Sequence, residues 1–273
     1  MTARATPAPV ASTTPIERAQ RLGRLASRIL LTWARAARPA ADSRMTAELA
    51  VDCARRTLAA LRVTVALRGE AALAGGPLLV VANHVSWLDV YLLNALGSAR
   101  FVAKSEVGRW PLVGPMAAAF GTFFIVRGSY HDAARVKDAI ANALRRGERG
   151  AVFPEGTTTD GTRVGPFYAA LLQAAIDAGA PVQAVAIRYV GSNGEPDAAA
   201  AFIDEMSFAE SLARILRRPG LAADVHVAPP FPSTRHTRRE LAFVTRRWIT
   251  AALLLEDAPQ PERRRRTITR RAA

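Results

Sequence analysis

The chain has 273 residues, of which 50% are apolar and 22% charged, and this size fits one large α/β domain. The single cysteine, Cys53, excludes an intrachain disulfide. The net charge of +14 is uneven: residues 1–40 carry +6 and residues 259–273 carry +5, which leaves +3 for the body. Basic ends of this kind predict contact with a polyanion, either an anionic membrane or a nucleic acid.

The first sixty residues predict two helices after an irregular segment. Residues 1–16 are rich in Ala, Thr and Pro, and we expect them to be disordered. In residues 17–37 apolar side chains recur at helical spacing, and arginines occupy the opposite face. The apolar stripe is Leu22, Leu25, Ala26, Ile29, Leu30 and Trp33, and the arginines are Arg21, Arg24, Arg28 and Arg35. A second helix is predicted at about 44–61.

The first predicted helix allows two interpretations. A basic amphipathic helix with a tryptophan on its apolar face is typical of a membrane interface. An ordinary helix that packs on the domain and exposes its arginines to water fits the same pattern equally well. Periodicity alone leaves both interpretations open.

From residue 62 the pattern alternates between short apolar strands and amphipathic helices. The predicted strands are 63–67, 77–82, 101–103, 122–126, 151–153, 182–189 and 223–228. The predicted helices are 87–96, 110–119, 131–146, 166–178, 207–217 and 235–256. This order predicts an α/β fold with a largely parallel or mixed sheet covered by helices, preceded by the helical pair. We therefore divide the chain into a disordered segment (1–16), a membrane-interface segment (17–61), a domain (62–258) and a basic disordered tail (259–273).

Several classes of active site lack their motifs. Neither of the two lysines in the chain follows a glycine, so there is no Walker A phosphate-binding loop. The G-x-S-x-G motif that carries a nucleophilic serine does not occur either. The histidines and the cysteine form neither H-E-x-x-H nor C-x-x-C, so we expect no metal site. No apolar run approaches the ~18–20 residues of a membrane span.

The first candidate group directly follows the predicted strand 77–82. It is the stretch from Asn83 to Asp89, with the sequence N-H-V-S-W-L-D. Ligands of open α/β sheets bind beyond the carboxyl ends of strands. A histidine there can act as a base, and a nearby carboxylate can fix its tautomer, so His84 and Asp89 are the candidates. Taken alone, such a pair is more simply explained by a structural histidine.

Two further groups follow other predicted strands. Arg127 follows strand 122–126, and a guanidinium suits a phosphate or carboxylate, although a surface arginine is the simpler explanation for a single residue. The stretch from Phe153 to Thr157, F-P-E-G-T, follows strand 151–153. Its carboxylate, backbone N–H groups and hydroxyl can bind an anion or a developing oxyanion, or they can form an ordinary turn. Because all three groups follow strands of one sheet, we expect them to converge on one site.

Together these motifs resemble the four blocks of the glycerolipid acyltransferase family, whose best-known members are the lysophosphatidic acid acyltransferases. The N-H-x-S-x-x-D block is 83–89, the G-x-x-F-x-x-R block is Gly121, Phe124 and Arg127, and the F-P-E-G-T block is 153–157. The fourth block corresponds to 181–187, and the similarity covers roughly residues 60–230.

The resemblance implies transfer of a fatty acyl group from acyl-CoA or acyl-carrier protein to the hydroxyl of a lysolipid, in membrane lipid biosynthesis. It implies that His84 removes the proton of the hydroxyl and that Asp89 orients His84, without another cofactor. The remaining block residues would bind substrate: Asn83, Ser86, Gly121, Phe124, Arg127, Phe153, Pro154, Glu155, Gly156 and Thr157. We expect the enzyme at the cytoplasmic face of the inner membrane, attached peripherally or monotopically to anionic lipid.

The choice of acceptor depends on one place where the chain departs from the family pattern. Many phosphatidic-acid-forming members carry an arginine directly after F-P-E-G-T, where this chain has Thr158. We expect 1-acylglycerol-3-phosphate as acceptor, and another lysolipid such as lyso-ornithine lipid as the alternative. A non-enzymatic nucleic-acid-binding module would need a basic stripe in the body, which carries only +3, so we expect no nucleic acid. A non-catalytic lipid-binding protein would not need His84, Asp89 and Glu155.

Overall fold

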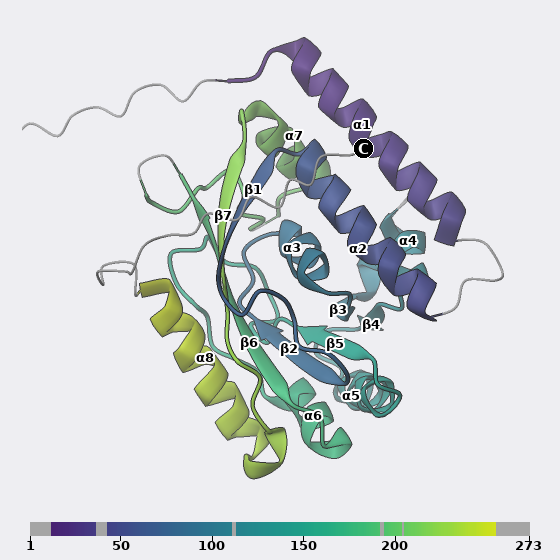
Figure 1. The fold of residues 1–273 in the computed structure, drawn as a ribbon, viewed down its shortest axis with the longest axis vertical. Helices are drawn as coiled ribbons and strands as arrows, with labels where there is room; N and C mark the ends of the chain where they lie inside the picture. The colour runs from purple at the N-terminus through teal and green to yellow at the C-terminus, as the bar shows by residue number, and fades with distance from the viewer. Residues whose placement is uncertain (1–11, 37–42, 111–112, 192–193, 204, 255–273) are drawn as a thin grey trace, which may run out of the picture.

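A computed structural model describes residues 12–36, 43–110, 113–191, 194–203 and 205–254 (Figure 1). The predicted disorder of residues 1–11 and of the tail 259–273 lies outside this range. Residues 12–16 were also predicted to be disordered, and here the structure differs. Thr13 is buried, because its hydroxyl donates to the Leu216 carbonyl at 2.6 Å and its N–H donates to the Arg217 carbonyl at 3.0 Å.

Seven strands form one mixed sheet in the order β1-β7-β6-β2-β5-β3-β4. They are β1 (Val63–Gly69), β2 (Leu78–Ala82), β3 (Arg100–Lys104), β4 (Phe123–Ile125), β5 (Arg149–Val152), β6 (Val182–Val190) and β7 (Leu221–Val227). Strands β6, β2, β5, β3 and β4 are parallel to one another. β7 runs antiparallel to β6, and β1 is parallel to β7. The carboxyl ends of the five parallel strands therefore share one edge.

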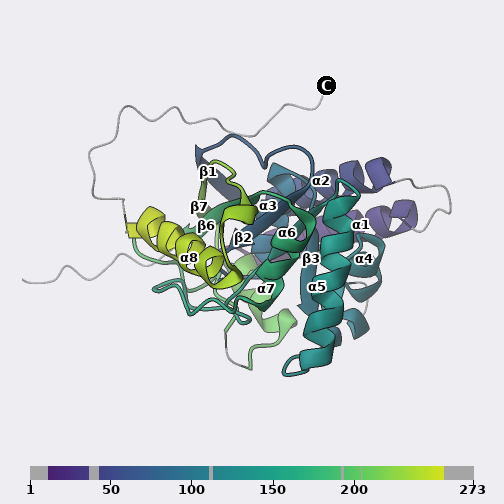
Figure 2. The same ribbon diagram turned by 90° about the horizontal axis from the view of Figure 1, so that it is seen from below.

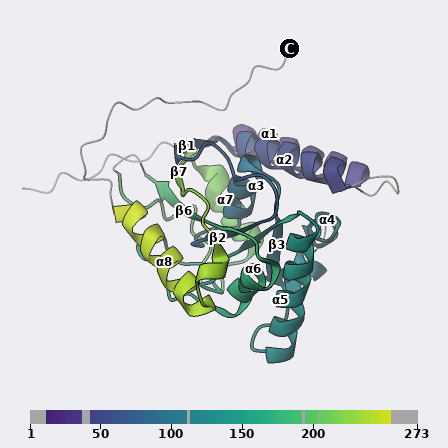
Figure 3. The ribbon, with the colours of Figure 1, turned by 60° about the horizontal axis from the view of Figure 1, so that its bottom comes forward.

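Helices cover both faces of the sheet (Figures 2 and 3). α1 (Pro15–Ala36), α2 (Ser43–Ala60), α3 (Leu88–Leu96) and α7 (Phe208–Arg217) lie on one side. α5 (Tyr130–Arg145), α6 (Gln173–Ala178) and α8 (Arg238–Leu254) lie on the other, and α4 (Val113–Ala119) packs beside α1. Short 3-10 turns occupy Ser105–Arg109, Ala170–Leu172 and Ser233–Arg235.

One predicted helix is shorter than expected. Residues 166–178 were predicted to be helical, but helical structure starts only at Ala170. The preceding residues are held in an irregular path because the Tyr168 N–H donates to the Pro154 carbonyl at 2.8 Å and the Gly165 N–H donates to the Glu155 carboxylate at 2.7 Å. These bonds tie the segment to the loop after β5.

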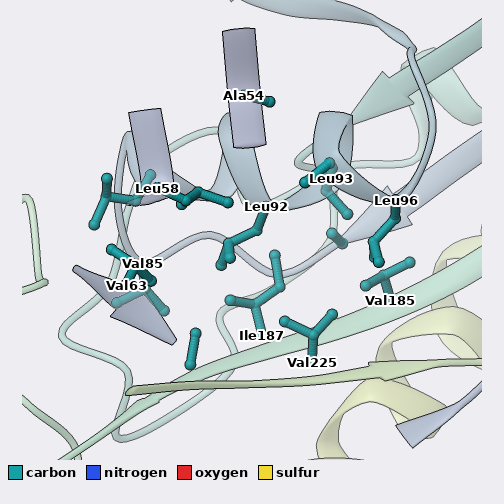
Figure 4. Close-up of a cluster of buried hydrophobic side chains, with 14 of the residues drawn as sticks. Ala54, Leu58, Val63, Val85, Leu92, Leu93, Leu96, Val185, Ile187 and Val225 are labelled. Atoms are coloured by element: carbon teal, nitrogen blue, oxygen red, sulfur yellow. The ribbon is translucent and has the colours of Figure 1, made fainter. Parts of the chain in front are cut away.

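The larger core lies between the sheet and the helices α2 and α3 (Figure 4). β2 is buried at every position, as a central parallel strand with two covered faces requires. It contributes alternate residues to the cores on its two faces, with Val80 in one and Leu79 in the other. The buried centre of the sheet therefore ends two residues before His84.

The structure of α1 differs in part from the two faces that the sequence predicted for this helix. Arg21, predicted on the solvated face, is 2% exposed, and its guanidinium donates to the carbonyls of Leu216, Arg218 and Leu61. The predicted apolar stripe is divided between two environments. Leu25 is buried, whereas Leu22, Leu30 and Trp33 are 46%, 50% and 44% exposed.

Candidate active site

His84 lies two residues beyond β2, and its backbone is held from both sides. Its N–H donates to Glu155 Oε1 at 2.7 Å, and its carbonyl accepts from the Thr159 N–H at 2.8 Å. The Phe153 ring stacks on the imidazole with the ring centres 4.0 Å apart and the planes 9° from parallel. The His84 side chain is 21% exposed, so it is fixed in place and still accessible from solvent.

Asp89 supplies the carboxylate that faces His84. Its Oδ2 lies 2.8 Å from His84 Nδ1 and accepts the N–H groups of Val85 and Ser86 at 2.8 and 2.9 Å. Asp89 sits in the first turn of α3, where the helix dipole and free N–H groups favour an anion. The carboxylate is fully buried. A proton on Nδ1, shared with this carboxylate, leaves Nε2 to accept a proton from a substrate.

Asn83 and Ser86, both predicted to bind substrate, are turned into the protein. The Asn83 side chain donates to the Ile187 carbonyl at 2.9 Å and accepts the Ile187 N–H at 2.8 Å. It thereby extends the pairing of β2 and β6 past the end of β2. The Ser86 hydroxyl is buried and accepts the Leu88 N–H at 3.3 Å at the start of α3. The contacts described for both residues therefore build the loop that carries His84.

Glu155 is also engaged within the protein. Its two oxygens accept the N–H groups of His84 and Gly165, each at 2.7 Å, and the residue is 4% exposed. Burial raises the pKa of this carboxyl above its ordinary value. A Cβ at position 165 would lie 2.8 Å from Glu155 Oε2, so only glycine permits this approach. The structure thus places Glu155 in a link between two loops, where the sequence predicted contact with the acceptor.

The rest of the F-P-E-G-T block divides by exposure. Phe153 covers the imidazole, and Pro154 is buried. Gly156 and Thr157 are exposed, and Gly156 has a left-handed backbone with φ of +66°. Of this block, Gly156 and Thr157 are the members open to a ligand, so their substrate contact stays a prediction.

The G-x-x-F-x-x-R block follows the same edge of the sheet. Arg127 lies two residues beyond β4 and is exposed, and it forms no ion pair with any residue that the structure describes. Partial burial lowers the pKa of its guanidinium, and the charge of Glu106 acts in the opposite direction. Gly121 has φ of +70°, and its carbonyl accepts from Arg100 Nε at 2.7 Å. Phe124 is half-buried and packs close to Gly108. Arg127 is therefore the member of this block that is free to bind an anion.

Sequence reasoning missed two residues at the site, Tyr189 and Gly165. The Tyr189 hydroxyl donates to Asp89 Oδ1 at 2.8 Å from a position 100 residues away. Its only signal in the sequence is a tyrosine at the end of the predicted strand 182–189, which also contains the polar residues Gln183 and Arg188. Gly165 carried no signal, because its role depends on the approach of Glu155. In the described ranges, no group of three or more His, Cys, Asp or Glu side chains could hold a metal ion.

Comparisons with known proteins agree with this geometry. A family model described as Acyltransferase matches residues 64–188. A lyso-ornithine lipid O-acyltransferase from Pseudomonas aeruginosa is 41% identical over 209 residues, which are 77% of this chain and 80% of that protein. This chain belongs to the acyltransferase family. The predicted family and the acyl-transfer activity are thereby confirmed.

A second relative and one solved structure are also similar to this acyltransferase. A 1-acyl-sn-glycerol-3-phosphate acyltransferase from Neisseria meningitidis is 40% identical over 154 residues, covering 56% of this chain and 60% of that protein. The crystal structure of the 1-acyl-sn-glycerophosphate acyltransferase PlsC from Thermotoga maritima superimposes with a TM-score of 0.69. At 19% identity, over 90% of this chain and 97% of that one, this likeness shows the fold alone. The expected mixed α/β fold with N-terminal helices is confirmed.

Proposed function

We propose that this acyltransferase moves an acyl group from a thioester, acyl-CoA or acyl-carrier protein, to the hydroxyl of a lysolipid. The observation that carries the mechanism is the 2.8 Å contact between a buried Asp89 and a partly exposed His84. Nε2 of His84 takes the proton of the hydroxyl as its oxygen attacks the thioester carbonyl. The new C–O bond forms, the C–S bond breaks, and the leaving thiolate takes the proton from the imidazolium. Asp89 stabilises the imidazolium between these steps.

Direct transfer needs no acyl-enzyme intermediate. Cys53 is buried in the helical pair, and burial raises the pKa of its thiol, so it is not an activated nucleophile. Exposed Arg127 and the turn at Gly156 and Thr157 lie beyond the carboxyl ends of β4 and β5, at the edge that also carries His84. They are the groups to which we assign the polar head of the acceptor.

For the acceptor, lyso-ornithine lipid is favoured over 1-acylglycerol-3-phosphate. Thr158 stands where many phosphatidic-acid-forming members have an arginine, and its hydroxyl donates to the Phe202 carbonyl. The relative that aligns over 80% of its length is named as a lyso-ornithine lipid O-acyltransferase. The second candidate, 1-acylglycerol-3-phosphate, is the one that the sequence led us to expect. It is supported by the exposed Arg127, whose guanidinium suits a phosphate, and by the Neisseria relative.

A thiol-release assay with matched acceptors tests both the proposed reaction and the choice of acceptor. The purified enzyme is offered acyl-CoA and acyl-carrier protein, each with lyso-ornithine lipid and with 1-acylglycerol-3-phosphate. Faster release with lyso-ornithine lipid supports the first candidate, and faster release with the phosphate acceptor supports the second. Thr158→Arg should shift the ratio of the two rates toward the phosphate acceptor. Absence of thiol release with every lysolipid would contradict the proposed function.

We further propose that α1 attaches the enzyme to an anionic membrane, at the cytoplasmic face, where both thioester donors occur. Exposed Leu22, Leu30 and Trp33 follow one strip of the helix, and exposed Arg24, Arg28 and Arg35 lie across from it. This pattern suits a helix that lies in the plane of the interface. Of the described helices, none is long and apolar enough to cross a membrane.

Vesicle sedimentation tests this attachment with a matched pair of variants. Leu30→Ser with Trp33→Ser removes the strip and should lower the affinity for anionic vesicles by about tenfold or more. Leu31→Ser is the control, since Leu31 is 52% exposed on the arginine side of the same helix. If both variants lost vesicle affinity equally, or if neither lost any, α1 would serve only to pack against the domain.

A further inference from the structure

We propose that Tyr189 is a positioning residue of the active site: its hydroxyl holds the second oxygen of Asp89 and so sets the orientation and strength of the base His84. The inference rests on the proposed role of His84 as base. It adds a residue outside the four blocks that suggested the site, from a strand that reaches the site only through the fold.

The hydrogen bonds around Asp89 are divided unequally between its oxygens. Oδ2 accepts two backbone N–H groups and faces His84 Nδ1. The Tyr189 hydroxyl, at 2.8 Å, is the one donor to Oδ1 that the described residues provide. Asp89 is fully buried and Tyr189 is 2% exposed, so water does not readily replace this bond. A buried carboxylate oxygen without a donor is costly, and charge-assisted bonds of this kind are among the stronger ones.

The fold places Tyr189 through Asn83. The Asn83 side chain forms two hydrogen bonds with Ile187 on β6, and Tyr189 is two residues further along this strand. Since side chains alternate along a strand, Ile187 and Tyr189 share a face, the one that packs toward α3. The residue before His84 therefore fixes the strand that carries Tyr189, and Tyr189 in turn fixes Asp89.

The Tyr189 hydroxyl is suited to act as a permanent donor. Burial, reinforced by the Asp89 charge, raises the pKa of this phenol well above its ordinary value, so it stays protonated throughout the neutral range. The other titratable groups around the pair are His84 itself and Glu155, which contacts the His84 backbone. Without the Tyr189 hydroxyl the carboxylate would be more basic, would bind Nδ1–H more strongly and would stabilise the imidazolium.

Tyr189→Phe removes one oxygen atom and tests the inference. We expect kcat to fall about tenfold and the acid limb of the pH profile of kcat/KM to move to higher pH by several tenths of a unit. The control is Tyr91→Phe, which removes the same atom from α3, two residues beyond Asp89. Tyr91→Phe should leave the acid limb in place. A loss of activity in Tyr189→Phe with an unmoved acid limb would reduce Tyr189 to a packing residue and overturn the inference.

A second measurement does not depend on turnover. The His84 Nδ1–H proton can be observed by NMR in the full chain without substrate. Its resonance should lie further downfield in Tyr189→Phe than in wild type, because its hydrogen bond to Asp89 becomes stronger. Site-specific replacement of Tyr189 by 3-fluorotyrosine keeps the ring and the hydrogen bond but makes the phenol a stronger donor. It should move the Nδ1–H resonance in the opposite direction. An unchanged Nδ1–H resonance in both variants would overturn the inference, whereas wild type inactive on every lysolipid would overturn the proposed function alone.

Discussion

The loops around His84 and the helix α1 depart from ordinary burial in opposite directions. Around His84 the polar side chains are buried: Asn83, Ser86, Asp89 and Glu155 are at most 4% exposed. On α1 the large apolar side chains Leu22, Leu30 and Trp33 are 44–50% exposed. A buried polar group is stable only when it is hydrogen-bonded, and an exposed apolar strip is stabilised by covering it. The hydrogen bonds of the first region fix the loops around His84, and the second region exposes an apolar strip that the proposed membrane contact would cover.

Replacing His84 should have the largest effect, because it removes the base and leaves the loop intact. The bonds that hold residue 84 use its backbone N–H and carbonyl, which alanine retains. His84→Ala should lower kcat by about a thousandfold or more with little change in the unfolding midpoint. His131→Ala, at an exposed position on α5, is the control. Near-normal thiol release by His84→Ala would refute the assignment of the base.

Asn83→Ala should test whether buried polar groups stabilise this region. The substitution removes both bonds to Ile187 and leaves a buried N–H and carbonyl without their partner. The free energy of unfolding, measured with urea, should fall by about 2–4 kcal/mol. Asn142→Ala, whose side chain bonds only Arg145 on the exposed face of α5, should change it by less than about 0.5 kcal/mol. Similar values for the two variants would mean that the β6 contact contributes little.

Arg21→Met should show how firmly α1 is attached to the domain. The guanidinium donates to three carbonyls, at 3.1 and 2.7 Å near the end of α7 and at 2.6 Å just beyond α2. We expect the free energy of unfolding to fall by about 2–3 kcal/mol and amide exchange in α1 to accelerate. Arg24→Met, at an exposed position on the same helix, provides the comparison. If both variants exchange like wild type, apolar packing alone holds the helix.

Glu155→Gln should have the smallest effect, and it should depend on pH. Because burial raises the pKa of Glu155 above its ordinary value of 4.5, the folded state binds its proton more tightly than the unfolded state does. This contribution to stability is present below about pH 4.5 and is lost as the pH rises through the raised pKa. The stability of wild type relative to Glu155→Gln should therefore decline from pH 4 to pH 7. The exposed control Glu70→Gln should show a stability difference from wild type that does not change with pH. The same constant difference for Glu155→Gln would contradict the prediction.

The amino-acid sequence predicted most of the fold's elements, since their signals are local. The alternation of strands and helices from residue 62, the two N-terminal helices and the positions of three motifs at strand ends all agree with the structure. It did not predict that β7 runs antiparallel to β6, nor that residues 166–169 leave the helix. Both features depend on hydrogen bonds to residues far away in the chain, which the periodicity of the sequence does not indicate.

At the active site, too, the sequence determined the local features, and the tertiary structure decided the contacts between distant segments. The sequence by itself determined that His84 and Asp89 lie close together after a buried strand, because Asp89 follows His84 by five positions and a helix begins between them. It also determined the uneven charge and the amphipathic character of α1. Only the tertiary structure decided that Asn83, Ser86 and Glu155 turn inward, that Arg21 is buried and that Tyr189 reaches Asp89. Burial and hydrogen bonding between distant segments are properties of the assembled layers, and the same residue types could equally have faced solvent.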